Sequence, residues 1–330
     1  MTAQETMSSA NLRNVLPTRY FQPAAWFRKF RMRCAAPDCA QRDKLWPSFL
    51  NAATGLTFDN RWYCTMGCMH GALMTRIRSL LAGSVQERPR RHRLPLGLLL
   101  VDRGVISQQQ LREALQWQTQ SGGEKLGHVL HLMGAIASDD LTAALAQQWG
   151  CPTFPLDRQT ALLGCHDLLP LAVLESAFAV PAFASLDGCT LHLAFGERLD
   201  HTTLYAVEQM LGCRTVPCVA AEASVSRVLE ELRRSASKEE TSFDTMRDPQ
   251  EITWTIRSYA GEYHASRIAI ARASDYLWVR FASGPATRDL LFRIRPEPES
   301  RRALHSAAAK GLAASADSRT DGVSDAAEQP

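Results

Sequence analysis

Four cysteines in the first quarter of the chain have the side chains and the spacing that a metal site requires. They form two close pairs, Cys34 with Cys39 and Cys64 with Cys68. Four thiolates suit tetrahedral zinc, and pairs of this kind sit on turns or at the start of a helix. Residues 1–82 hold little else that would form a core, so a bound metal would supply folding free energy. The pattern therefore predicts a structural zinc site.

Other interpretations of these cysteines stay open. The four side chains can also be ordinary reduced thiols, and His70 can take the place of one cysteine ligand. A catalytic metal is less well supported, and a disulfide does not suit the cytosolic chain predicted below. The remaining cysteines stand singly among apolar neighbours, which is typical of small buried side chains. They are Cys151, Cys165, Cys189, Cys213 and Cys218.

The most informative feature of the sequence is a duplication. Residues 95–118 and residues 125–148 share the pattern L-G-x-x-L-x-x-x-G-x-x-x-x-x-x-L-x-x-x-L-x-x-Q without a gap. This agreement indicates an internal repeat. The matching pairs, at an offset of 30 residues, are Leu96/Leu126, Gly97/Gly127, Leu100/Leu130, Gly104/Gly134, Ile106/Ile136, Leu111/Leu141, Ala114/Ala144, Leu115/Leu145 and Gln118/Gln148.

Each copy has the periodicity of two helices joined by a turn. The first leucines stand at helical spacing, and Gly104 or Gly134 then stands where a short helix stops in the left-handed conformation. Ser107 in copy one, and Ser138 with Asp139 in copy two, are natural N-caps for the second helix. The two later leucines of each copy lie one turn apart on one face. We therefore expect two helix pairs that pack together through their leucine faces.

The tandem motif resembles the MshEN-type N-terminal domain of the GspE family, the type II secretion and type IV pilus assembly ATPases. That family repeats the same pattern with an arginine before the first leucine, and seven of the eight defining positions match in each copy here. The resemblance continues to about residue 234, through a small α/β half. It implies a surface that wraps cyclic di-GMP and is lined by Leu96, Gly97, Leu100, Leu111, Leu115, Gln118, Lys125, Leu126, Gly127, Leu130, Leu141, Leu145 and Gln148.

The first position of each copy departs from the family pattern. The family has arginine there, whereas this chain has Pro95 and Lys125. Lysine keeps the charge without the planar fork of arginine, and proline keeps neither. By contrast, Gln118 and Gln148 are retained. On this interpretation the glutamines are not needed for packing, so they favour ligand binding through their side-chain amides.

Changes in composition divide the chain into segments. We expect an α+β multi-domain protein with a small zinc-ribbon-like N-terminal module, a central domain of tandem-repeat helices with a small α/β half, and a small α+β C-terminal block. In that block, strand-like stretches at residues 266–271, 276–281 and 290–294 follow an amphipathic start. The predicted boundaries are 1–82 for the zinc module, 83–93 for a basic linker, 94–234 for the MshEN-like domain, 235–251 for a second linker, 252–296 for the C-terminal block and 297–330 for a disordered tail.

Composition and missing motifs bear on the class of function. The net charge of +3 is too small to argue for a nucleic-acid or membrane surface. No segment approaches the roughly 18–20 apolar residues of a membrane span, and the N-terminus lacks the pattern of a secretory signal. We therefore expect a cytoplasmic protein. The sequence has no G-x-x-x-x-G-K-[ST] phosphate loop, no G-x-S-x-G and no H-E-x-x-H, so we expect a non-catalytic chain without the ATPase of the family it resembles.

The leading functional hypothesis is a sensor. Its central domain would bind cyclic di-GMP, or carry a degenerate form of that site, and would change how the chain meets a partner in the secretion or pilus machinery. The second hypothesis is a protein–protein adaptor in secretion, pili or motility that kept the fold and lost the nucleotide. The retained glutamines favour the first, and Pro95 favours the second. A weaker third is nucleic-acid binding through the zinc module and the basic residues 88–93, which the modest net charge disfavours.

Overall fold

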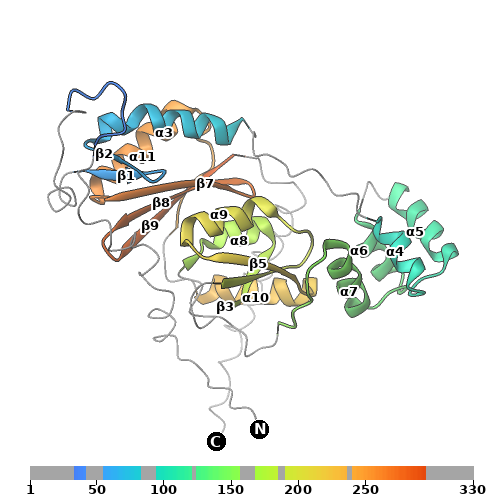
Figure 1. The fold of residues 1–330 in the computed structure, drawn as a ribbon. Coiled ribbons are helices and arrows are strands. Elements are labelled where there is room, and N and C mark those ends of the chain that lie inside the picture. Colours follow the sequence, from blue (N-terminus) through green and yellow to red (C-terminus); the bar gives the residue numbers. More distant parts are fainter. Residues whose placement is uncertain are drawn as a thin grey trace, which may run out of the picture. The chain divides into compact units, whose positions relative to one another are not determined.

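The computed structural model describes residues 33–41, 55–82, 94–120, 124–156, 168–184, 190–235 and 240–294. All of them belong to the first of the two units into which the chain divides, residues 1–294. These described residues contain nine helices and nine strands, which carry the labels of Figure 1. The predicted basic linker at 83–93 and the predicted tail at 297–330 lie outside the described residues, as do residues 1–32 of the predicted zinc module.

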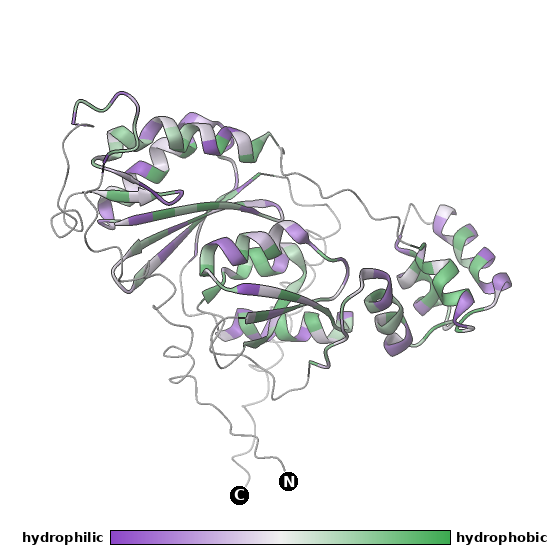
Figure 2. Ribbon diagram, viewed as in Figure 1, coloured by the Kyte–Doolittle hydropathy of each residue, from purple (hydrophilic) through white to green (hydrophobic). Residues whose placement is uncertain are grey.

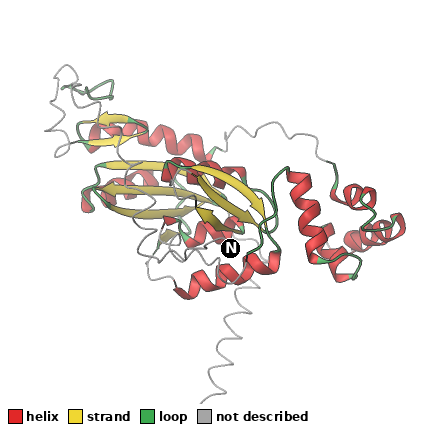
Figure 3. Cartoon of the chain, turned by 60° about the horizontal axis from the view of Figure 1, so that its bottom comes forward, coloured by secondary structure: helices red, strands yellow, loops and turns green. Residues whose placement is uncertain are grey.

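The duplicated motif folds into two consecutive helix pairs, which confirms the expected pattern (Figure 3). Gly104 and Gly134 follow the first helix of each pair with φ angles of +68° and +67°, the left-handed conformation expected of them. Helix α5 packs against α6 and α4 packs against α7, so each copy contacts the other. The helices are α4 (Leu96–Asp102), α5 (Gln108–Gln120), α6 (Leu126–Leu132) and α7 (Ser138–Trp149).

The second helices of the two copies begin differently. In copy one, Ser107 Oγ accepts a hydrogen bond from Gln110 N at 3.1 Å, and Ser107 N donates to Gln110 Oε1 at 2.8 Å. This reciprocal capping box confirms the predicted cap. In copy two the N-cap is Ala137 and Ser138 is the first helical residue, so the cap predicted at Ser138 and Asp139 was one residue late. The repeat offset places Ala137 where copy one has its serine, and Asp139 instead lies in the first turn, where the helix dipole favours negative charge.

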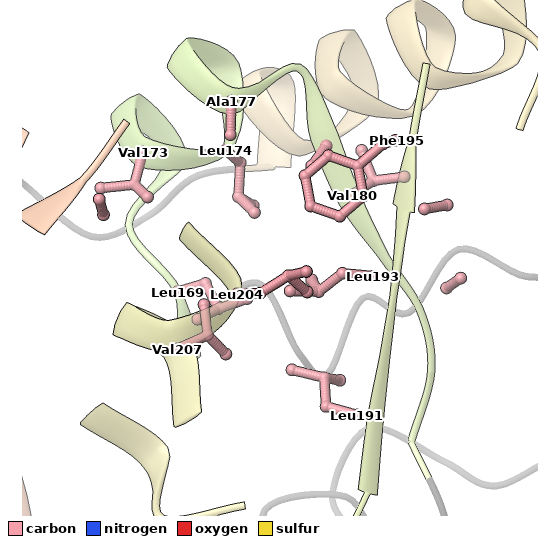
Figure 4. Packing of buried hydrophobic residues seen from close by; sticks show 14 of the residues in the cluster. Leu169, Val173, Leu174, Ala177, Val180, Leu191, Leu193, Phe195, Leu204 and Val207 are labelled. Carbon is pink, nitrogen blue, oxygen red and sulfur yellow. The ribbon is translucent and has the colours of Figure 1, made fainter. Parts of the chain in front are cut away.

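The second half of the predicted central domain is a three-stranded sheet with three helices. The strand order is β3-β4-β5, with β3 antiparallel and β5 parallel to β4. Figure 4 shows side chains of α8, β3, β4 and α9 meeting in its core, among them Leu174, Val180, Leu193 and Val207. The elements are α8 (Leu171–Ala177), β3 (Ala179–Ala184), β4 (Thr190–Phe195), α9 (His201–Leu211), β5 (Arg214–Val219) and α10 (Glu222–Ser235).

The first and last blocks of the chain share one six-stranded sheet, in the order β2-β1-β7-β8-β9-β6. Strand β1 pairs antiparallel with β2 and parallel with β7, where Thr57 lies opposite Arg267. Helices α3 and α11 cover one face of the sheet. The elements are β1 (Leu56–Phe58), β2 (Arg61–Tyr63), α3 (Met66–Leu81), β6 (Thr241–Phe243), α11 (Pro249–Glu262), β7 (Arg267–Ala273), β8 (Tyr276–Ser283) and β9 (Ala286–Arg293).

This sheet differs from the sequence-based expectation in two ways. The zinc-ribbon-like module and the C-terminal block were expected to be separate, whereas their strands pair with each other. A hairpin as short as β1–β2 is marginal alone and gains stability by joining a larger sheet. In addition, the stretch expected to be a linker at residues 235–251 contains β6 and the first turn of α11, whose N-cap Asp248 accepts hydrogen bonds from Gln250 N and Glu251 N, both at 3.2 Å. The three predicted strands correspond to β7, β8 and β9.

Candidate functional site

The glutamine that ends each copy of the tandem motif bonds to the residue directly before the other copy. Gln148 Nε2 donates to Leu94 O at 2.7 Å, and Gln118 Nε2 donates to Glu124 O. Each of these carbonyls stands one residue before the N-cap of the first helix of a copy. The expectation that the glutamines are not needed for packing was therefore wrong, because their amides join the two copies.

The glycines of the motif allow leucines from both copies to approach the first helices closely. A Cβ on Gly97 would lie 2.5 Å from Leu111 Cδ1 and 3.1 Å from Leu126 Cδ2. A Cβ on Gly127 would lie 3.0 Å from Leu141 Cδ1. The first of these contacts is shorter than real Cβ atoms show and the other two are tight, so a side chain at either position would require the facing leucine side chains to shift.

The predicted ligand residues divide by their burial. Leu100 and Leu130 are completely buried, Gly97 and Gly127 are buried as well, and these four positions build the fold. Leu115 is 43% exposed, and Lys125 is exposed as well. A ligand would therefore meet the exposed and half-buried members. The half-buried ones are Leu96, Leu111, Gln118, Leu126, Leu141, Leu145 and Gln148.

The family's arginine position is the N-cap of the first helix in each copy. Pro95 has φ −54° and ψ 137°, and Lys125 has φ −68° and ψ 133°, so the two copies share this backbone geometry. The Lys125 ammonium forms an ion pair with the Glu197 carboxylate, which lies just after β4 in the α/β half. Of the two equivalent positions, one thus carries no charge and the other is already paired with a carboxylate.

Exposed apolar side chains gather on the tandem helices. Six of the nine large exposed hydrophobic residues of the described chain belong to this region. Concentrated exposure of this kind marks binding surfaces, and Figure 2 shows hydrophobic and hydrophilic residues side by side on these helices. Alignment of the two copies selects only the positions that they share. It therefore identified Leu115 and missed the other five exposed hydrophobic residues of this region. The six residues are Leu94, Leu98, Leu115, Trp117, Leu132 and Met133.

The structure brings the four predicted cysteine ligands together. Their Sγ atoms all lie within 4.8 Å of one another, with 3.6 Å between Cys39 and Cys64 and 3.5 Å between Cys64 and Cys68. Zinc–sulfur bonds of about 2.3 Å in a tetrahedron place sulfur atoms about 3.8 Å apart. The cluster therefore fits a zinc ion. His70 lies outside it, with Nδ1 3.2 Å from Arg257 Nη1.

The electrostatics of the cluster also suit a cation. Burial raises the pKa of the Cys64 thiol, and the surrounding cysteine sulfurs raise it further. Burial acts in the same direction on Cys34, but backbone hydrogen bonds from Cys64 and Ala36, together with side-chain hydrogen bonds from Cys39 and Cys64, outweigh it and lower the pKa of that thiol. Four thiolates packed this closely repel one another, so full deprotonation requires a metal ion between them.

Comparison with known proteins bears on the central domain. No family model matches the chain. The chain is 33% identical over 138 residues to the type IV pilus assembly ATPase PilB of Myxococcus xanthus, which is 41% of this chain and 23% of that protein. This chain contains a domain of the GspE/MshE N-terminal type. Its similarity to PilB of Thermus thermophilus is 27% over 122 residues, 37% of this chain and 14% of the relative, so the chain spans less than a quarter of either protein.

Solved structures similar to the chain include those of MshE and of the N-terminal domain of XpsE. A structure of MshE with cyclic di-GMP has a TM-score of 0.37 and 28% identity, covering 42% of this chain and 99% of that one. The N-terminal domain of XpsE has a TM-score of 0.29 and 18% identity, covering 41% and 91%. These four similarities each cover between 37% and 42% of this chain. No helix among the described residues is both long enough and apolar enough to cross a membrane.

Proposed function

We propose that the GspE/MshE N-terminal-type domain of this chain is a non-catalytic sensor that binds cyclic di-GMP. One observation carries the proposal: copy one keeps the repeat's leucine at position 115 although 43% of this side chain is exposed, and copy two keeps it at Leu145. The fold does not require leucine at an exposed position, whereas the apolar face of a guanine base would cover it. The nucleotide is suggested by the motif, and MshE, to which the chain is similar, was solved with it.

The second candidate is an adaptor that retains the fold without the nucleotide. Three features favour it: Pro95 lacks a charge, Lys125 is paired with Glu197, and the glutamine amides bond within the fold. Under either proposal the partners belong to the secretion or pilus machinery, and the location is cytoplasmic. Nucleic-acid binding stays a weaker prediction, and the basic residues 88–93 on which it depends lie outside the described residues.

Leu115, which is exposed, and Leu145, which is half-buried, provide the test between sensor and adaptor. We expect a Leu115→Asp/Leu145→Asp variant of the full chain to bind cyclic di-GMP about tenfold more weakly or worse, a loss of about 1.4 kcal/mol, because carboxylates would face the base and the phosphates. Leu98→Asp is the matched control, since Leu98 is 56% exposed on a neighbouring helix but is not shared between the copies. Calorimetric titration measures both. Equal weakening by the two variants would argue that the leucines form no specific contact.

We also propose that a structural zinc ion binds the thiolates of Cys34, Cys39, Cys64 and Cys68. Elemental analysis of the full chain is expected to find about one zinc per chain, and a Cys34→Ser/Cys64→Ser variant is expected to lose it. Cys213→Ser is the control, because Cys213 is buried in the core of the α/β half. Retention of zinc by the double variant would place the metal elsewhere.

Zinc affinity is expected to fall as the pH falls. Since burial raises the pKa of Cys64, the metal-free thiol holds its proton through neutral pH, and zinc must displace that proton to bind. Acid therefore favours the protonated, metal-free site, and base favours the zinc-bound site. Competition with a chromophoric chelator between pH 6 and 8 measures the slope, and an affinity independent of pH would exclude thiolate ligands.

A further inference from the structure

All four cysteines of the cluster belong to the first block of the chain, and Cys34 and Cys64 are buried in the core that this block shares with the last one. Thr57 N in strand β1 donates to Ser266 O at 2.8 Å, directly before β7. The hairpin of β1 and β2 ends at Tyr63, directly before Cys64, and Thr65 caps helix α3 by accepting from Cys68 N at 3.2 Å. The same short segment thus carries half of the cluster and connects the edge of the sheet to the helix layer above it.

The helices that cover the sheet also connect the two ends of the described chain. Helix α3 packs along α11, and Thr253 Oγ1 lies 3.7 Å from Met74 Sδ in the buried interface. Nearer the cluster, Arg257 lies 3.2 Å from His70 and stacks over the Trp254 ring at 4.8 Å from its centroid. Residues from both ends of the chain therefore meet in both layers.

The core of this region depends on both ends together. Side chains from residues 33–82 and from residues 240–294 form one buried cluster, and it is the only such cluster to which the described residues of the first segment belong. Strands β1 and β2 have only three residues each, so their ladder bonds alone hold them weakly. The buried members include Cys34, Phe58, Leu73 and Ile77 from the first end, and Ile252, Ile256, Ile268 and Phe281 from the second.

We propose that the cysteine cluster is a metal clasp that closes a discontinuous domain, made of residues 33–82 and 240–294, into which the GspE/MshE N-terminal-type domain is inserted. This inference rests on the proposed zinc site. With the metal bound, both ends of the inserted domain connect to one fixed body. When the metal is removed, the hairpin and α3 loosen, and α11 and β7 lose the partners that cover them.

Hydrogen–deuterium exchange of the full chain, read by mass spectrometry, tests the clasp. The samples are the zinc-loaded protein, the chelated protein, the Cys34→Ser/Cys64→Ser variant and the Cys213→Ser control. On metal loss we expect exchange to quicken by about tenfold or more, a 1.4 kcal/mol loss of protection, in residues 55–82 and also in 249–262 and 267–273. Exchange in helices α4–α7 and in the control is expected to stay unchanged.

A second variant tests the clasp without changing any of the four cysteines. Thr57→Pro removes the N–H that bonds to Ser266 and so weakens the pairing of β1 with β7. Because linkage is reciprocal, this variant is expected to bind zinc about tenfold more weakly. Unchanged zinc affinity would overturn the clasp.

The exchange outcomes separate the two proposals. If zinc binds but its removal leaves the exchange rates in residues 249–273 unchanged, the clasp is wrong and the zinc site still stands. Equal loosening of α4–α7 overturns the clasp as well, because metal loss then unfolds the whole chain. Absence of zinc from the purified protein overturns the zinc proposal and the clasp together.

Discussion

Replacement of Arg280 by leucine is expected to lower the free energy of unfolding by about 3–5 kcal/mol, because it leaves a buried carboxylate unpaired. The Arg280 side chain is 3% exposed, and its Nε and Nη2 donate to the two Asp289 oxygens, each at 2.8 Å. Its Nη2 also donates to Leu168 O at 2.6 Å, which ties the six-stranded sheet to the segment before α8. Urea denaturation of the full chain measures the change.

Two further variants identify the cause of that loss. Arg280→Leu/Asp289→Leu is expected to recover part of the stability, since it removes the orphaned charge, although Trp278 Nε1 then loses the acceptor it has at 2.9 Å. Arg234→Leu is the surface control, expected to change stability by less than about 0.5 kcal/mol, because Arg234 pairs with Glu230 in solvent on α10. A loss below about 1 kcal/mol for Arg280→Leu would show that water reaches the pair.

Leu100→Ala is expected to destabilise the tandem helices by about 2–5 kcal/mol through the cavity it leaves. Leu100 is completely buried where the two copies meet, whereas Leu98 on the same helix is 56% exposed. Leu98→Ala is therefore the matched control and is expected to cost less than about 0.5 kcal/mol. Similar losses for the two variants would contradict the packing described here. Hydrogen exchange of α4–α7 reports the local effect directly.

The helix pairs were predictable because their signals are local. Helical spacing of leucines, a left-handed glycine such as Gly104 and a capping serine such as Ser107 each act within a few residues. The copy-two cap was misplaced because Ala137 has no side chain that signals a cap. The shared sheet was not predictable, because β1 has only three residues and pairs with β7 far along the chain. A strand of three residues is too short for a sequence pattern from which its pairing partner could be predicted.

The candidate sites were predictable to different degrees. Cysteine type and pair spacing sufficed to choose Cys34, Cys39, Cys64 and Cys68, which the fold brings within 4.8 Å of one another. The motif positions were chosen by resemblance, and sequence alone did not separate fold residues from surface residues. Gln148 shows why: its hydrogen bond to Leu94 O, 54 residues away in the sequence, depends on tertiary structure. The ligand role of the motif residues stays a prediction.

The most direct test of the central proposal is calorimetric titration of the full chain with cyclic di-GMP, with GTP as the control nucleotide. Micromolar or tighter binding of cyclic di-GMP, with no heat from GTP at the same concentration, is the predicted result. It would mean that Pro95 is tolerated and that the ligand displaces Glu197 from Lys125 or binds beside the pair. No heat from cyclic di-GMP at millimolar concentration would contradict the sensor and favour an adaptor that keeps the fold alone.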